Sequence, residues 1–212
     1  MSNFVKRIIS TLILIPLALY FIVHGSYMLM FFTATCFLVA CYEWHMMTKK
    51  KSYKIYGFPF LFCSFFTFYE LDSTLVLFVI LICISTDIGG YIFGKIFKGP
   101  KLTKISPNKT YAGMIGGYFL SLISLTMITN LIDSQTPLQF FLFTLIISTV
   151  SQSGDIIVSY FKRLSKIKDT GKIIPGHGGL LDRIDGMIFA FPIAYLINLT
   201  GYLNVWKKKL QY

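Results

Sequence analysis

Residues 74–94 read TLVLFVILICISTDIGGYIFG, an apolar run that contains one charged side chain, Asp87. A helix that crosses the hydrocarbon core of a bilayer needs about 20 consecutive, mostly apolar residues. This stretch has that length and that composition, so it predicts a membrane-spanning helix. Asp87 stands in its second half, where a carboxylate is costly unless a cation, a partner or water compensates its charge.

The rest of the chain repeats this apolar pattern. Of its 212 residues, 55% are hydrophobic and 14% are charged, and most charged residues fall in short clusters between long apolar runs. Such a composition is typical of a protein whose solvent is the bilayer. We therefore predict an all-α polytopic membrane protein with about seven transmembrane helices, near residues 8–24, 27–46, 55–70, 74–94, 111–131, 138–160 and 184–205. The first run has no clear cleavage site behind it, which favours a retained helix over a signal peptide.

The basic residues predict the orientation of these helices. Three loops, around residues 49–54, 95–109 and 162–183, are rich in lysine and arginine. By the positive-inside rule these loops face the cytoplasm, in what we expect to be a bacterial inner membrane. We expect a polar cavity to open on that side, and the basic residues to contact membrane lipids. Seven helices place the basic tail at Lys207–Lys209 on the far side, against the rule. Although the net charge is +11, no soluble module is available to hold a duplex, so we expect no nucleic-acid partner.

Carboxylates in or beside the apolar runs are the first candidates for chemistry. Asp87 and Asp155 each stand beside small residues within such a run, which favours a functional role over a lysine pair that merely closes the bundle. Asp182 and Asp185 are spaced i, i+3 and would share one helix face. Hard oxygen ligands of this kind predict a site for Mg²⁺ and a polyphosphate, with a second cation left open. For Asp185 alone, a charge at a helix N-terminus is the alternative.

Cations and glycines lie close to these acids in sequence. Only three arginines accompany 17 lysines, and Arg163 and Arg183 are two of them, which favours sites that need a planar, bidentate donor. The glycines of the stretch PGHGG at residues 175–179 would let backbone amides approach an anion closely. His177 is either a phosphate-binding or proton-transferring group or a hydrogen-bonded loop histidine. We expect phosphate binding by Lys109, Lys162, Arg163, Lys168, His177, Gly178, Gly179 and Arg183, and membrane anchoring by Lys166 and Lys172.

Three groups of residues form longer motifs. The segment from Ser159 to Asp185 contains SYFKR, KDTG and IPGHGGLLDRID, the segment 105–110 reads ISPNKT, and Asp87 is followed by Tyr91 and Gly94. Together they resemble the phosphatidate cytidylyltransferase (CDP-diacylglycerol synthase) family over most of residues 85–195. The first segment specifies about a dozen polar or glycine positions, so the resemblance is specific.

The resemblance implies an activity and a set of site residues. The family transfers CMP from CTP to phosphatidic acid, giving CDP-diacylglycerol and pyrophosphate, and its members use Mg²⁺ and form membrane-embedded homodimers. It implies Asp155 and Asp182 as metal ligands, Asp87 and Lys109 as further residues needed for activity, and Ser106 of the second motif as a substrate-binding residue. On this basis residues 1–80 are N-terminal transmembrane helices and residues 81–212 the catalytic membrane region.

The chain departs from the family pattern in two places. It has Tyr111-Ala112-Gly113 where members have Trp-Glu-Gly, so any role of that glutamate is absent. Glu43-Trp44 also looks similar to the family, but only residues 45–86 separate it from Asp87, which corresponds to a loss of about two helices. The family's helix count is therefore in doubt for this chain, while the motifs are intact.

Two other functional classes remain open from the sequence. A CTP-dependent polyprenol or phytol kinase, or a cytidylyltransferase acting on another lipid phosphate, would use similar residues. An ion-coupled transporter would use Asp87 and Asp155 as coupling sites, but it predicts an inverted repeat, and none is visible.

Overall fold

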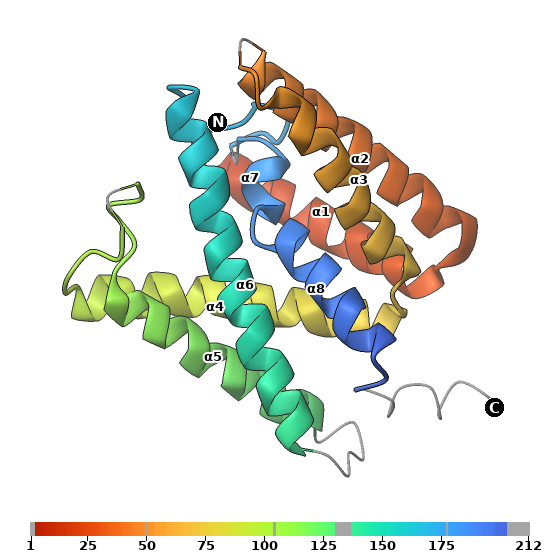
Figure 1. Ribbon diagram of the computed structural model, residues 1–212, viewed down its shortest axis with the longest axis vertical. Coiled ribbons are helices and arrows are strands. Elements are labelled where there is room, and N and C mark those ends of the chain that lie inside the picture. Colours follow the sequence, from red (N-terminus) through yellow and green to blue (C-terminus); the bar gives the residue numbers. More distant parts are fainter. Residues whose placement is uncertain (1–2, 50, 104, 130–136, 177, 203–212) are drawn as a thin grey trace.

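The computed structural model describes residues 3–49, 51–103, 105–129, 137–176 and 178–202, and within these every regular element is a helix. These residues form seven longer helices and one short helical turn, α7, and Figure 1 shows the turn lying among the helices. The elements are α1 (Asn3–His24), α2 (Ser26–Thr48), α3 (Lys54–Glu70), α4 (Ser73–Phe97), α5 (Tyr111–Thr129), α6 (Pro137–Leu164), α7 (Leu181–Ile184) and α8 (Met187–Leu199). The predicted all-α class is confirmed.

Each predicted span corresponds to one of the seven longer helices. Among the described residues, α2, α4 and α6 are long and apolar enough to cross a membrane, and shorter apolar helices occur within α1, α5 and α8. The count of seven crossings therefore stays a prediction beyond these three. The last span begins at Met187 rather than at residue 184, because residues 181–184 form the separate turn α7. The tail at Lys207–Lys209 lies outside the described residues.

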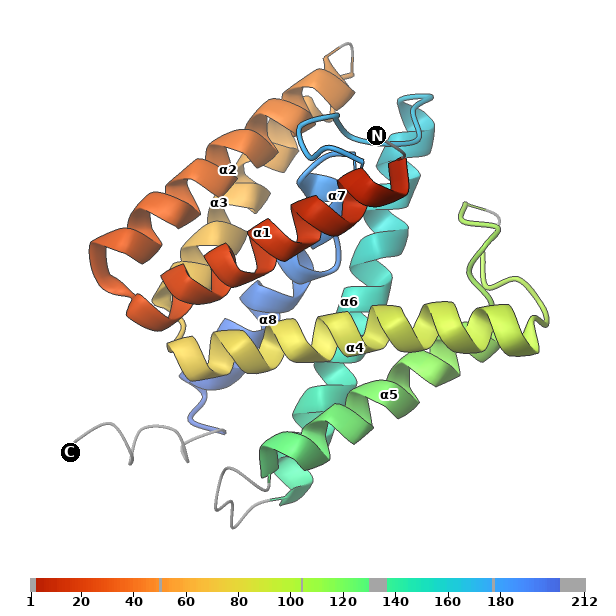
Figure 2. The same ribbon diagram turned by 180° about the vertical axis from the view of Figure 1, so that it is seen from behind.

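The loop between α6 and α7 lies at the end of the bundle where α1 begins (Figure 1). There, near the start of α1, the Ser10 hydroxyl donates to the Pro175 carbonyl at 3.1 Å. At the other end, the Ser73 hydroxyl at the start of α4 donates to the Ile22 carbonyl at 2.9 Å. Figures 1 and 2 both show the carboxyl ends of α2 and α6 on the same side as α7.

Helix α4 forms the centre of the hydrophobic core. Its residues Phe78, Val79 and Ile82 are fully buried and pack against α6 and α8. Figure 2 shows α4 crossing α6, with α1 on the viewer's side of α7 and α8. The predicted division between residues 80 and 81 falls inside α4, and the hydrophobic core around this helix contains residues from both sides of that boundary. The division therefore separates the motif-containing part of the sequence from the part before it.

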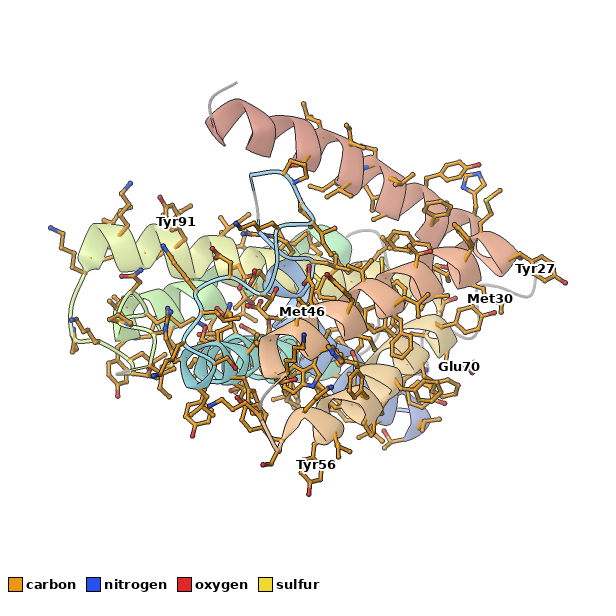
Figure 3. All side chains as sticks on the ribbon, turned by 90° about the horizontal axis from the view of Figure 1, so that it is seen from above. Tyr27, Met30, Met46, Tyr56, Glu70 and Tyr91 are labelled. Atoms are coloured by element: carbon orange, nitrogen blue, oxygen red, sulfur yellow. The ribbon has the colours of Figure 1, made fainter. Side chains whose placement is uncertain are left out.

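The outward face of the bundle is strongly apolar. Large side chains such as Leu12, Phe31 and Ile55 are 67%, 71% and 72% exposed. Figure 3 shows Tyr27, Tyr56 and Tyr91 at the periphery of the molecule. A surface of this kind in water would be an aggregation hazard, whereas lipid accommodates it. The exposed apolar side chains therefore agree with a membrane protein.

Glycines allow α4 and α5 to pack with their backbones in close contact. A Cβ built on Gly89 would overlap the Gly116 carbonyl oxygen, and one on Gly113 would lie 2.7 Å from the Gly90 oxygen. Small residues at helix interfaces permit this approach in membranes. The two glycine clusters in the sequence, GGYIFG and GMIGG, thus fix the position of α5 and of the loop that precedes it.

Replacing Gly89 by alanine is expected to lower the melting temperature of the detergent-solubilised protein by several degrees. The new methyl group meets backbone, which cannot rotate away, and overpacking of this kind costs about 1–3 kcal/mol. Gly90→Ala is the matched control, since its nearest neighbour would be the Gly113 oxygen at 3.7 Å, an ordinary contact. Equal melting temperatures for the two variants would show that close packing at Gly89 does not hold the pair together.

Candidate active site

The loop between α6 and α7, residues 165–180, folds back into a compact turn. Ile174 and Gly178 exchange two backbone hydrogen bonds, of 2.9 and 3.2 Å. Gly178 adopts a φ of 91°, a left-handed conformation that favours glycine. The glycine-rich stretch predicted to cradle an anion is therefore a tight turn, and it brings α7 back toward the end of α6.

Asp182 is the hydrogen-bonding centre of this loop. Its Oδ2 accepts from the Thr170 amide at 2.8 Å and from the Gly179 amide at 3.1 Å. Its Oδ1 accepts from the Lys162 ammonium at 2.9 Å. Only 6% of the Asp182 side chain is exposed. One carboxylate thus joins both arms of the loop to the last turn of α6.

Lys162 extends this network to a second carboxylate. Its Nζ lies 3.9 Å from Asp185 Oδ2, and its side chain is 11% exposed. Asp185 stands between α7 and α8, outside both helices. Burial above all, and then the charge of Asp155, raise the pKa of Asp185 well above its ordinary value, while Lys162 opposes this rise. Burial and the neighbouring acid thus disfavour the charged carboxylate of Asp185, and a further cation beside it would favour that form.

The second ion pair joins α6 to the loop before α5. Lys109 Nζ contacts Asp155 Oδ2 and donates to the Gln152 carbonyl at 3.4 Å. The Ser159 hydroxyl donates to Asp155 Oδ1 at 3.4 Å. About a quarter of each ion-pair side chain is exposed, which leaves the pair accessible to a small ligand. The predicted residues Lys109 and Asp155 are therefore brought together.

Ser106 positions Lys109 through the backbone. The Lys109 amide donates to the Ser106 carbonyl at 3.0 Å, and the Ser106 amide donates to Thr103 Oγ1 at 3.1 Å. Leu102 and Lys109 continue the same hairpin with a bond of 2.8 Å. The ISPNKT motif is thus a turn that presents the Lys109 side chain to α6, while contact of Ser106 with substrate stays a prediction.

Asp87 completes the group of charges from α4. It interacts electrostatically with Asp155, Lys109 and Arg183, and also with Asp185. The side chain lies at the depth of α4 where the glycines let α5 approach. Three carboxylates, from α4, α6 and the α7–α8 junction, therefore interact with one another and with Lys109 of the loop before α5, Lys162 of α6 and Arg183 of α7.

The donor set suits a hard divalent cation. Mg²⁺ commonly takes one or two protein carboxylates and completes its shell with phosphate oxygens and water. Asp155 and Asp185 are carboxylates whose charges act on each other across this space. Asp182, the second ligand implied by the resemblance, is engaged by Lys162 and two backbone amides. Within the described ranges, no three histidine, cysteine or acidic side chains converge closely enough to hold a metal without such additional ligands.

The remaining predicted residues lie at the edge of this network. Arg163 is exposed and donates from Nη1 to the Ile167 carbonyl at 3.2 Å, and Lys168 is exposed on the same loop. The Gly178 amide donates a hydrogen bond to the Ile174 carbonyl, and the Gly179 amide donates one to Asp182 Oδ2, so both amides stabilise the loop itself. His177 lies outside the described residues. Substrate contacts by all five of Arg163, Lys168, His177, Gly178 and Gly179 stay predictions.

Glu43, on α2, is a site residue that the sequence analysis did not select. It is 1% exposed, and its carboxylate accepts from the Thr170 hydroxyl at 3.0 Å and from the amides of Leu180 and Leu181 at 2.9 and 2.8 Å. A Cβ on Gly179 would overlap this carboxylate. Glu43 therefore fixes the start of α7 from a distant helix. It is an acid inside an apolar run, the same signal that selected Asp87 and Asp155.

Comparisons with known proteins show which proteins this chain resembles. The model of the cytidylyltransferase family matches residues 54–200, which contain both ion pairs and the loop before α7. The chain is 35% identical to the phosphatidate cytidylyltransferase of Rickettsia typhi (strain ATCC VR-144 / Wilmington), with 93% of each chain covered, and 33% identical to that of Rickettsia felis (strain ATCC VR-1525 / URRWXCal2) with the same coverage. It is 43% identical to the phosphatidate cytidylyltransferase of Staphylococcus aureus (strain COL) over 65% of this chain and 55% of that one.

Proposed function

The chain belongs to the cytidylyltransferase family, and from this premise we propose that it transfers CMP from CTP to phosphatidic acid, giving CDP-diacylglycerol and pyrophosphate in phospholipid biosynthesis. The observation that carries the proposal is the set of ion pairs and electrostatic interactions that links Asp87, Asp155 and Asp185 with Lys109, Lys162 and Arg183. These groups suit two anionic substrates that must approach each other.

The reaction needs positioning and charge neutralisation more than covalent help. A phosphate oxygen of phosphatidic acid attacks the α-phosphorus of CTP in line, a new P–O bond forms, and the bond to the β-phosphate oxygen breaks as pyrophosphate leaves. Donors already aimed at the oxygens that gain charge lower the barrier without reorganisation. Holding both reactants in the attack geometry supplies a further large share of the rate.

We assign the roles as follows. Lys109, held against Asp155, lies where two helices and a loop meet and would contact the triphosphate. Lys162 is paired with Asp182 and Asp185 and would neutralise the phosphates between them. Arg183, with its planar bidentate fork, would bind the lipid phosphate. Arg163 and Lys168 would attract the incoming nucleotide from the exposed end of α6.

The cation would be held by Asp155 together with Asp185 or Asp182, and Asp87 would support it from α4. When bound, Mg²⁺ neutralises phosphate oxygens and orders the triphosphate for in-line attack. Asp182 also holds the loop against Lys162 through its three hydrogen bonds. A second cation at the same acids remains part of the proposal.

The placement in the cell follows from the charge pattern. The carboxyl ends of α2 and α6, which lead into basic loops, lie on the same side as α7 (Figure 1), so we propose that the site faces the cytoplasm. CTP would enter from water, and phosphatidic acid would enter from the surrounding lipid. The homodimer implied by the family remains part of this proposal.

Labelled CTP tests the reaction directly. Purified protein in detergent would receive Mg²⁺, phosphatidic acid and CTP labelled at either the α- or the γ-phosphate. We expect the α-label in the lipid extract and the γ-label in pyrophosphate. A CTP-dependent lipid kinase would instead place the γ-label in a lipid and release CDP, and that outcome would contradict the proposal.

A further inference from the structure

An apolar cavity of about 510 Å³ begins at the candidate active site. Its catalytic end is formed by Ile174, Leu180, Arg183 and Ile184, residues of the loop and turn that hold Asp182. Of the described residues that line it, Arg183 is the one with a charged side chain. The remaining wall comes from α1, α2, α3, α4 and α8, and it is almost entirely hydrocarbon in character. One end of the cavity is therefore cationic, and the rest is apolar.

The cavity extends from the site to about the depth of one lipid leaflet. On α2, Thr33 lines the cavity, while Glu43 accepts a hydrogen bond from the Leu180 amide at the catalytic end of the cavity. Ten residues of helix separate these two, which corresponds to about 15 Å at 1.5 Å per residue. Half of a hydrocarbon core of about 30 Å is the same length. The cavity thus has the reach of one extended acyl chain.

Helix α1 leaves the cavity open toward lipid. Its residues Leu14, Ile15 and Leu19 line the cavity and are still 40%, 50% and 43% exposed. Hydrogen bonds tie the helix at its two ends, from Ser10 to the loop and from Ser73 to Ile22. A lipid tail can therefore enter from the side while its headgroup reaches the site.

We propose that this cavity holds one acyl chain of the lipid substrate, with the lipid phosphate at Arg183. This inference rests on the proposed function and adds to it the position of the tail and the direction from which the lipid binds. The arrangement matches each part of a phosphatidic acid with its complement, since a dianionic head meets a guanidinium and a hydrocarbon tail meets apolar side chains. It also makes chain length a determinant of activity.

Chain-length dependence in a cavity-filling variant tests the proposal. Ala18 is half-buried on the α1 wall, eight residues beyond Ser10 and therefore about 12 Å from the catalytic end. A hexanoyl chain stops short of that depth, whereas an oleoyl chain passes it. We expect Ala18→Phe to lower CDP-diacylglycerol formation from dioleoyl phosphatidic acid at least about tenfold while leaving the rate with the dihexanoyl substrate within about twofold.

Ile13→Phe is the matched control, because Ile13 lies on the same helix, is 59% exposed and does not line the cavity. Its ratio of long-chain to short-chain rates should equal that of the wild type. An unchanged ratio in Ala18→Phe would overturn the proposal. If the wild type forms no CDP-diacylglycerol from either substrate, it is the proposed function that fails.

Photolabelling of the wild type needs no variant. Phosphatidic acid and phosphatidylcholine, each with a diazirine at the middle of one acyl chain, would be compared in the same detergent. We expect phosphatidic acid to label peptides covering residues 14–22 and 77–84 more strongly, and excess dihexanoyl phosphatidic acid to reduce that labelling. Equal labelling by both lipids would mean that the cavity takes bulk lipid only, and the proposal would be wrong.

Discussion

Asp155→Asn is expected to lower the rate of CDP-diacylglycerol formation by a factor on the order of 10²–10³. The amide keeps the shape of the side chain but removes the charge that pairs with Lys109 and interacts with Asp87 and Asp185. Without that charge the site loses its proposed cation ligand, and Lys109 loses its ion-pair partner. The measurement is transfer of α-labelled CTP into lipid by purified protein, at saturating concentrations of both substrates.

Asp72→Asn is the matched control for this variant. Asp72 caps the start of α4, where its side chain accepts from the Thr74 amide at 2.9 Å, and asparagine caps helices about equally well. The same change of charge at the opposite end of the bundle should leave the rate within about twofold. If Asp155→Asn keeps more than a tenth of the wild-type rate, Asp155 is not the cation ligand on which the reaction depends.

Glu43→Gln should have the second largest effect, although Glu43 touches neither of the two ion pairs. The carboxylate accepts three hydrogen bonds from the loop and the start of α7, and a glutamine must turn its NH₂ group toward one of those donors. A buried donor left unsatisfied costs about 1–3 kcal/mol. Because a displacement of about 1 Å near the reacting groups can cost on the order of 10²-fold in rate, we expect activity to fall by about that factor.

The accompanying loss of stability distinguishes this effect from loss of a ligand. Glu43→Gln should lower the melting temperature by several degrees, whereas Asp155→Asn should change it little. Glu70→Gln, on the exposed end of α3, is the control and should match the wild type in both measurements. Full activity of Glu43→Gln would show that the loop keeps its position without the carboxylate.

The positions of the helices could be predicted closely from the apolar runs, because membrane helices are specified by length and hydrophobicity alone. Residues 74–94 lie within α4 and residues 55–70 within α3. The separate turn α7 could not be predicted in this way, because Leu181 and Asp182 are held by hydrogen bonds to Glu43 and Lys162, residues distant in sequence.

The predictability of the site differed from residue to residue. The burial cost of a carboxylate selected Asp87 and Asp155, and the structure places both in one electrostatic cluster. The two glycines at residues 178 and 179 were interpreted as an anion cradle, yet their amides serve the loop itself, a pairing that only three-dimensional contacts reveal. Glu43 carries the same signal, an acid inside an apolar run, but its partners lie 127 to 138 residues away, so its contacts with the loop could not be predicted.

Binding of Mn²⁺ together with CTP, followed by electron paramagnetic resonance of the detergent-solubilised protein, tests the central claim most directly. That claim is that the acids around Asp155 hold a divalent cation where nucleotide and lipid meet. The wild type should bind Mn²⁺ and CTP together, and Asp155→Asn should lose most of that binding while Asp72→Asn keeps it. Equal binding by all three proteins would contradict the account.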